Sequence, residues 1–160
     1  GMGTAVVSGR TGIVATLESV GTDPLHASVV RAVRSDDGGR TWSWAVAERA
    51  LVHAARKPRF AAYCPWLTRL SDRRLACVFT TNERQEVHDP PGTPAHRLHG
   101  DVALRLSDDE GRTWGEAQVL YSGGGRNYMP QLLDLGGGRL VCLCLDFALD
   151  RFVAVPGRLG

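Results

Sequence analysis

The longest irregular stretch of the sequence, 81–101, is also the richest in side chains that can exchange protons or bind charged groups. Glu83 and Asp101 lie near its two ends, with His88, His96 and His99 between them. Long loops in compact domains are often functional. The pair His96-x2-His99 lies among prolines and glycines and lacks the regular scaffold of a metal site. We therefore expect functional side chains here, with no metal and no cofactor.

A second group of polar residues follows further along the chain. Arg126, Asn127 and Tyr128 lie in the segment GGGRNYMP, and Asp146 ends an apolar strand. A carboxylate at the end of a buried strand is unfavourable unless it is paired or lies at an exposed rim. Arginine suits the binding of anionic groups because its planar guanidinium can grip a carboxylate with two hydrogen bonds. These residues therefore join the candidate site.

The strands that must position these groups can be identified from a repeat. Tyr63 and Tyr128 each open a segment reading Tyr-x-Pro-x-Leu-x-x-Leu-x-x-x-Arg-Leu-x-Cys. Each segment predicts a hairpin, and further apolar runs predict the other strands. The sequence therefore predicts an all-β chain of four-stranded antiparallel units without helices, in which the first strand of the earliest unit is missing or degenerate. The predicted strands are 12–18, 28–34, 45–48, 66–70, 75–80, 102–106, 117–121, 131–135 and 140–145.

Two nearly identical nine-residue boxes follow the third strand of two units. The first box, 35–43, reads SDDGGRTWS, and the second box, 107–115, reads SDDEGRTWG. An aspartate can accept bonds from backbone N–H groups downstream, glycine can adopt φ > 0, and tryptophan can bury a large ring. We therefore expect every shared position to be structural. These positions are Ser35, Asp37, Gly39, Thr41, Trp42, Ser107, Asp109, Gly111, Thr113 and Trp114.

Strand alternation assigns the candidate residues to one edge of the fold. Antiparallel strands alternate in direction, so the turns that contain the boxes lie at one edge together with the first-to-second turns. The opposite edge carries the segments 49–63, 81–101 and 122–128 and the strand end at Asp146. The candidate residues should therefore converge opposite the boxes.

The boxes and their flanks resemble the Asp-box, or BNR, repeats of the sialidase (neuraminidase) superfamily. The resemblance covers about residues 25–147 and implies that each four-stranded unit is one blade of a β-propeller, usually six-bladed. In that family the box joins the third and fourth strands, away from the active site. The resemblance implies one sialidase-like propeller domain or fragment over 4–160, a partial propeller of about two to three blades. Residues 1–3 are expected to be a tag scar and disordered start.

The resemblance also implies a chemistry. Sialidases are retaining glycoside hydrolases with a tyrosine nucleophile, an acid/base aspartate and three arginines around the substrate carboxylate. Their first arginine lies in an Arg-x-Pro motif, where this chain has Tyr63 and Tyr128 instead. On this basis Glu83 or Asp101 is the expected acid/base, and Tyr128 a pocket wall or the nucleophile. The expected substrate ligands are Arg126, Asn127, Arg59 and Asp146.

Three functional hypotheses follow from these observations. The polar loops favour a sialidase-like exo-glycosidase that acts on sialic acid or another terminal sugar. The tyrosines in place of arginine favour a non-catalytic module that binds carbohydrate or protein, and a truncated remnant without its own function is the third hypothesis. Two to three blades leave apolar flanks uncovered, and about four close a ring. We therefore expect a carbohydrate ligand, and either self-association or a longer chain.

Composition excludes other classes of partner. The 160 residues carry a net charge of +2 with scattered arginines, so no nucleic-acid-binding patch is expected. No apolar run is long enough to span a membrane. The four cysteines, which are Cys64, Cys77, Cys142 and Cys144, are expected to be buried free thiols, which slightly favours a reducing, cytoplasmic location.

Overall fold

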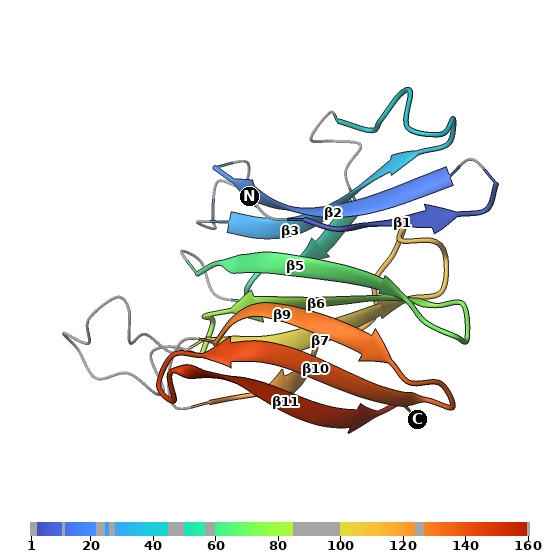
Figure 1. Cartoon of the computed structure of the whole chain (residues 1–160). Coiled ribbons are helices and arrows are strands. Elements are labelled where there is room, and N and C mark those ends of the chain that lie inside the picture. The colour runs from blue at the N-terminus through green and yellow to red at the C-terminus, as the bar shows by residue number, and fades with distance from the viewer. Residues whose placement is uncertain are drawn as a thin grey trace.

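The computed structural model describes residues 3–10, 12–21, 25, 28–44, 50–56, 60–84, 100–123 and 127–159. Within these residues the fold is entirely β, and the strands form three antiparallel sheets stacked one on another (Figure 1). The described residues contain no helix that could cross a membrane. The predicted all-β class is confirmed.

Each sheet is a meander in which neighbouring strands are consecutive in the sequence. The first sheet has four strands: β1 (Ala5–Ser8), β2 (Gly12–Val20), β3 (Ser28–Ser35) and β4 (Ala50–His53). The second sheet has β5 (Ala62–Arg69), β6 (Leu75–Thr81), β7 (Asp101–Ser107) and β8 (Gln118–Tyr121). The third has β9 (Asn127–Asp134), β10 (Arg139–Asp146) and β11 (Arg151–Arg158).

Two hydrophobic cores hold the three sheets together. Between the first and second sheets, Val14, Leu75 and Phe79 are completely buried. Between the second and third sheets, Leu104 and Leu132 pack in a second core. The second sheet is thus covered on both faces, which explains why every residue of β6 is buried. Each such aliphatic or aromatic side chain contributes about 1.5–3 kcal/mol on burial.

The cysteines behave as small apolar residues in these cores. All four are free and buried, as predicted. Cys142 and Cys144 alternate with exposed or half-buried residues along β10 and point to the same face. Burial raises the pKa of the Cys142 thiol to about 12 and that of Cys144 to about 11, which makes both thiols poor nucleophiles.

The two boxes occupy equivalent turns, as the repeat predicts. The first box joins β3 to β4, and the second joins β7 to β8. We call this side of the molecule, on the right in Figure 1, the box edge; it also carries the β1–β2, β5–β6 and β9–β10 turns. The opposite side, which carries the remaining connections, is the loop edge. The strand-alternation argument therefore holds.

Several predicted strand boundaries are wrong. The first unit does have a first strand, β1, and its sheet includes β4 at 50–53, whereas the predicted strand 45–48 lies outside the described residues. β5 and β9 begin four residues earlier than expected, because a β-bulge carries the chain past the proline in each. β11 was not predicted. Of the expected start, 1–3, only Gly3 is among the described residues.

Candidate functional site

The loop edge brings together the candidate residues that the structure describes. Asp101 begins β7, Asp146 ends β10, Glu83 follows β6, and Tyr128 lies at the start of β9. Asn127 begins β9, where its backbone is paired with Asp146. Arg59, Arg126, His88, His96 and His99 lie outside the described residues. Within the described part of the chain, no group of side chains could hold a metal ion.

Asp101 is a completely buried carboxylate with two partners from neighbouring segments. The hydroxyl of Ser122 donates to its Oδ1 at 2.6 Å, and Arg84 Nη1 lies 3.4 Å from its Oδ2. Ser122 directly follows β8, whereas Arg84 follows β6. A buried carboxylate requires such partners, because desolvation of an unpaired charge is expensive. Asp101 therefore has a fixed orientation at the loop edge.

Asp146 is also completely buried, and its contacts are with the fold itself. Its Oδ1 accepts hydrogen bonds from the backbone N–H groups of Ala148 and Leu149, at 2.8 and 3.2 Å, in the β10–β11 turn. Its Oδ2 accepts one from the Tyr121 hydroxyl at 2.7 Å. The pKa of Tyr121 is raised to about 12, mainly by this hydrogen bond to a carboxylate and, to a smaller extent, by burial. Asp146 thus shapes a turn and joins β8 to β10.

Glu83 is half-buried and is oriented by a backbone group. Its Oε2 accepts a hydrogen bond at 2.7 Å from the backbone N–H of Arg56, in the β4–β5 connection. The adjacent Asn82 is paired with Ala61, donating from its backbone N–H and accepting at Oδ1 at 2.7 Å. The end of β6 is therefore anchored to the chain that leads into β5. Glu83 is the more accessible of the two acid/base candidates.

Three aromatic rings form a row at the same edge. The rings of Tyr63 and Tyr128, on β5 and β9, have centroids 5.3 Å apart, and Phe147 meets Tyr128 edge-on at 5.8 Å. Tyr63 is buried, whereas Phe147, in the β10–β11 turn, is 47% exposed. We call Tyr63, Tyr128 and Phe147 the aromatic row. Phe147 was missed by the sequence reasoning, because one phenylalanine in a turn carries no recognisable signal.

The box carboxylates are engaged in their own loops. In the second box, Asp109 Oδ1 accepts from the Thr113 backbone N–H at 2.9 Å and from Ser107 Oγ at 2.8 Å. Thr113 Oγ1 donates to Asp109 Oδ2 at 2.6 Å. Asp37 has the same set of bonds in the first box, from Thr41 and Ser35. These bonds suit a scaffold loop and leave the carboxylates little capacity for a ligand.

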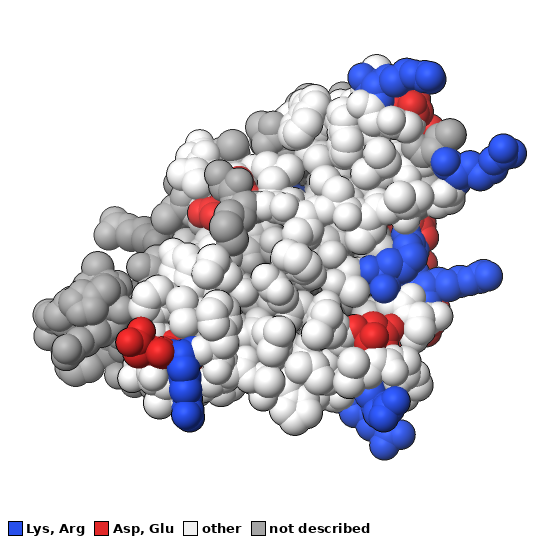
Figure 2. Space-filling model, in the orientation of Figure 1, with Lys and Arg blue, Asp and Glu red and all other residues white. Residues whose placement is uncertain are grey.

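The boxes also connect neighbouring sheets. Arg34, just before the first box, donates to the backbone carbonyl of Glu110 in the second. Arg69, at the end of β5, donates two bonds to the Glu110 carboxylate, at 3.0 and 2.6 Å, and also donates to the Val7 carbonyl. On the face that Figure 2 shows, the charged side chains of the described residues lie mainly along this box edge, and the surface next to it is largely uncharged.

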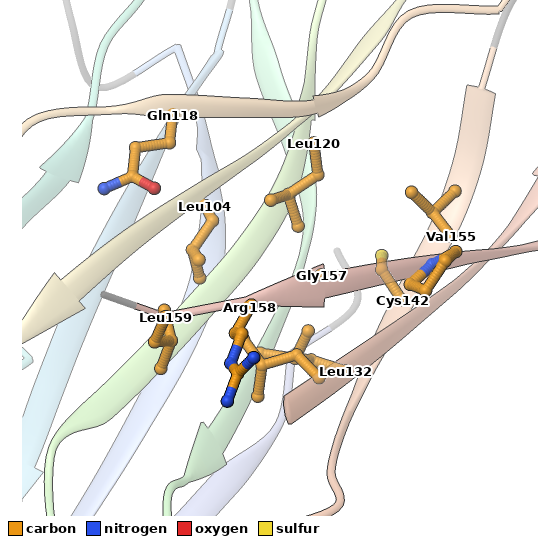
Figure 3. A pocket seen from close by; sticks show the side chains of 11 residues that line it. Leu104, Gln118, Leu120, Leu132, Cys142, Val155, Gly157, Arg158 and Leu159 are labelled. Atoms are coloured by element: carbon orange, nitrogen blue, oxygen red, sulfur yellow. The ribbon is translucent and has the colours of Figure 1, made fainter. Parts of the chain in front are cut away.

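Hollows lie beside the described strands at both edges, and one of about 530 Å³ opens at the first box between Arg34, Asp37 and Arg112. A small cavity of about 50 Å³ between the second and third sheets is lined mostly by apolar side chains such as Leu104, Leu132 and Val155 (Figure 3). Its size and lining identify it as packing space. A larger hollow of about 390 Å³ lies along β5 and β9, the first strands of the second and third sheets. It is lined by Cys64, Pro65 and Trp66 of β5 and by the equivalent residues of β9, Met129, Pro130 and Gln131. The lining of this hollow therefore begins with the residues that directly follow Tyr63 and Tyr128 in the sequence.

Solved structures with a similar fold include glycoside hydrolases. An α-L-arabinofuranosidase of Fusarium graminearum, solved with an iminosugar inhibitor, matches 96% of this chain with a TM-score of 0.68 and 16% identity. An α-L-arabinanase of Penicillium chrysogenum, complexed with arabinobiose, matches 96% with a TM-score of 0.67 and 20% identity. A Hadza microbial sialidase matches 98% with a TM-score of 0.65 and 16% identity.

These comparisons establish the fold. The chain has the fold of part of a β-propeller, as its boxes predicted. It spans 44% of the length of the arabinofuranosidase and of the arabinanase, and 30% of the sialidase. No protein-family model and no curated protein sequence matches the chain.

Proposed function

We propose that this chain carries the site of a glycoside hydrolase that acts on terminal sugars, and that the site lies at the loop edge. The observation that supports this most directly is the location of Glu83, Asp101 and Tyr128 at the same edge, opposite the boxes. Carboxyl groups and a phenol are the groups that retaining glycosidases of this type use. The shared fold with arabinan-acting enzymes and a sialidase supports the same class.

In the proposed mechanism, Glu83 is the general acid/base. The bond from the Arg56 backbone N–H engages Oε2 and orients the carboxyl group, so Oε1 is the atom that transfers the proton to the leaving oxygen. Asp101 is more deeply buried and is held by Ser122 and Arg84, so it supports the charge distribution of the site or serves as the alternative acid/base. Tyr128 lines the pocket or acts as the nucleophile.

The proposed substrate is a neutral terminal sugar, with arabinofuranosyl groups preferred over sialic acid. Sialic acid carries a carboxylate, which the related family binds through an arginine of the Arg-x-Pro motif. The corresponding positions here are Tyr63 and Tyr128. Arg59 and Arg126 remain proposed substrate ligands, here for hydroxyl groups of the sugar.

Hydrolysis of aryl glycosides tests this proposal. Release of the aryl group is measured with an aryl α-L-arabinofuranoside and an aryl sialoside, for the parent, Glu83→Gln and Asp101→Asn. Loss of an acid/base group should lower kcat/KM on the arabinoside by at least about 100-fold. Glu116→Gln, which alters an exposed carboxylate before β8, is the matched control. Turnover that survives both site changes would overturn the assignment.

A second candidate is a carbohydrate-binding module without catalysis. Two observations favour it: the tyrosines in place of arginine, and the use of Asp146 by the fold. Binding of arabinobiose without turnover of either aryl glycoside would support this candidate. The chain spans less than half of the length of the neighbouring structures, and a complete catalytic site can require further blades. This observation therefore also favours the second candidate.

A further inference from the structure

The same unusual backbone occurs twice at the loop edge. Cys64 follows Tyr63 and precedes Pro65, and Met129 follows Tyr128 and precedes Pro130. Both middle residues have positive φ, 52° and 50°. This region is disfavoured for residues with a Cβ, and a following proline favours extended backbone instead. The structure therefore maintains the same strained conformation at equivalent positions of two sheets.

Each strained residue lies in a β-bulge that changes which face its tyrosine occupies. On β5, Tyr63 pairs with Thr80 and Trp66 with Val78, so the two residues between Tyr63 and Trp66 lie opposite a single residue of β6. On β9, Tyr128 pairs with Leu145 and Gln131 with Leu143, so again two residues of β9 lie opposite a single residue of β10. One extra residue reverses the alternation of side chains before it, and bulges often redirect side chains next to active sites. The two bulges therefore set the direction of both tyrosines.

The redirected rings meet between the second and third sheets. Tyr63 and Tyr128 have centroids 5.3 Å apart, with their planes inclined at 44°. Phe147 extends the row at 5.8 Å, and its ring is almost perpendicular to that of Tyr128. Since Phe147 is 47% exposed, the row runs from a buried tyrosine to a ring accessible to solvent.

We propose that the aromatic row is the stacking wall of a sugar subsite, with Phe147 as its accessible ring and Tyr128 behind it. The ligand class is a neutral furanose or pyranose, whose C–H face packs on an aromatic ring while its hydroxyl groups remain solvated or bonded elsewhere. The residues that follow the two tyrosines in the sequence, Cys64 and Met129, line a hollow of about 390 Å³. This inference rests on the proposed function and adds the residues that recognise the sugar ring.

Titration calorimetry with arabinobiose tests the wall. The dissociation constant is measured for the parent, Phe147→Ala and Phe152→Ala. We expect Phe147→Ala to weaken binding about tenfold, since aromatic contacts of this kind contribute on that scale. Phe152, which is 64% exposed on β11 and outside the row, is the matched control and should have no effect.

The possible outcomes distinguish failure of the proposed stacking wall from failure of the proposed function. If the parent binds arabinobiose and Phe147→Ala binds equally well, the wall is wrong and the proposed function stands. If Phe152→Ala weakens binding as much as Phe147→Ala, the effect is not specific to the row and the wall is also wrong. If the parent binds neither arabinobiose nor free sialic acid, both proposals fail. Thermal melting of each variant confirms that the fold is retained.

Discussion

At the scale of single residues, the two box aspartates and the two acid/base candidates are held in different ways. Asp37 and Asp109 are bonded within their own loops at the box edge. Asp101 and Glu83, at the loop edge, are held by groups from other segments. A carboxylate that accepts bonds from its own loop stabilises that loop, whereas one held from several segments can be presented to a ligand. This difference is the residue-level basis for placing the site opposite the boxes.

The box carboxylates predict a dependence of stability on pH. Bonds from Thr41 and Ser35 lower the pKa of Asp37 to about 2. Desolvation would raise the pKa of Asp109, but bonds from Thr113 and Ser107 outweigh it and lower the value to about 2. Because both folded pKa values lie below the ordinary aspartate value of 3.8, the stabilisation is complete above about pH 4 and is lost as the pH falls towards 2.

Urea unfolding between pH 5 and pH 2 measures this effect. The free energy of unfolding of the parent should fall over this range more steeply than that of the double variant Asp37→Asn/Asp109→Asn. Asp150→Asn, in the exposed β10–β11 turn, is the control and should follow the parent. Equal slopes for the parent and the double variant would show that the box carboxylates do not carry the effect.

At the scale of elements, the two boxes differ in how closely they pack. Gly39 and Gly111 both have positive φ, 89° and 78°. A Cβ at Gly111 would lie 3.1 Å from Val14 Cγ1 in the core, whereas at Gly39 the nearest atom would be 3.5 Å away. The second box is therefore inserted more tightly between the first and second sheets.

Alanine substitutions test this difference in packing. Gly39→Ala should cost about 1–2 kcal/mol for the left-handed backbone alone. Gly111→Ala should cost about 1 kcal/mol or more beyond that, because Val14 is completely buried and must move. Chemical denaturation of both variants gives the comparison. A larger cost at Gly39 than at Gly111 would contradict the described packing.

The elements also show what could be predicted from sequence. The boxes and the hairpins after Tyr63 and Tyr128 were predictable, because each depends on turn chemistry within a few residues. The early starts of β5 and β9 were not, since a proline usually ends a strand and the bulges appear only in the fold. The Tyr121–Asp146 and Ser122–Asp101 bonds join residues 25 and 21 positions apart, so only tertiary structure brings them together.

At the scale of the whole molecule, the two outer sheets present uncovered apolar faces. On the third sheet, Leu133 pairs with Val141 and Val141 with Pro156, and Leu133 is half-exposed. On the first sheet, Val7 pairs with Ile13, and Val7 is largely exposed. Burial of such surface contributes about 25 cal/mol per Å². We propose that a further sheet covers these faces, from a second copy or a continuing chain.

Sedimentation velocity at micromolar concentration tests this proposal on the chain itself. The parent should form dimers or larger species, and Leu133→Glu should shift it towards the monomer by placing a charge on the open face. Val119→Glu is the matched control, because Val119 is 48% exposed on β8, away from the open faces of the outer sheets. A parent that is a stable monomer would contradict the proposal.

The central claim, that the ligand binds at the loop edge, is tested most directly by an NMR titration of the ¹⁵N-labelled chain with arabinobiose. We expect the largest amide shifts at Tyr63, Glu83, Ser122, Tyr128 and Phe147, which belong to different strands and turns of one edge. The amides of both boxes should remain in place. Shifts centred on Asp37 and Asp109, or the absence of any shift at saturating sugar, would contradict the account.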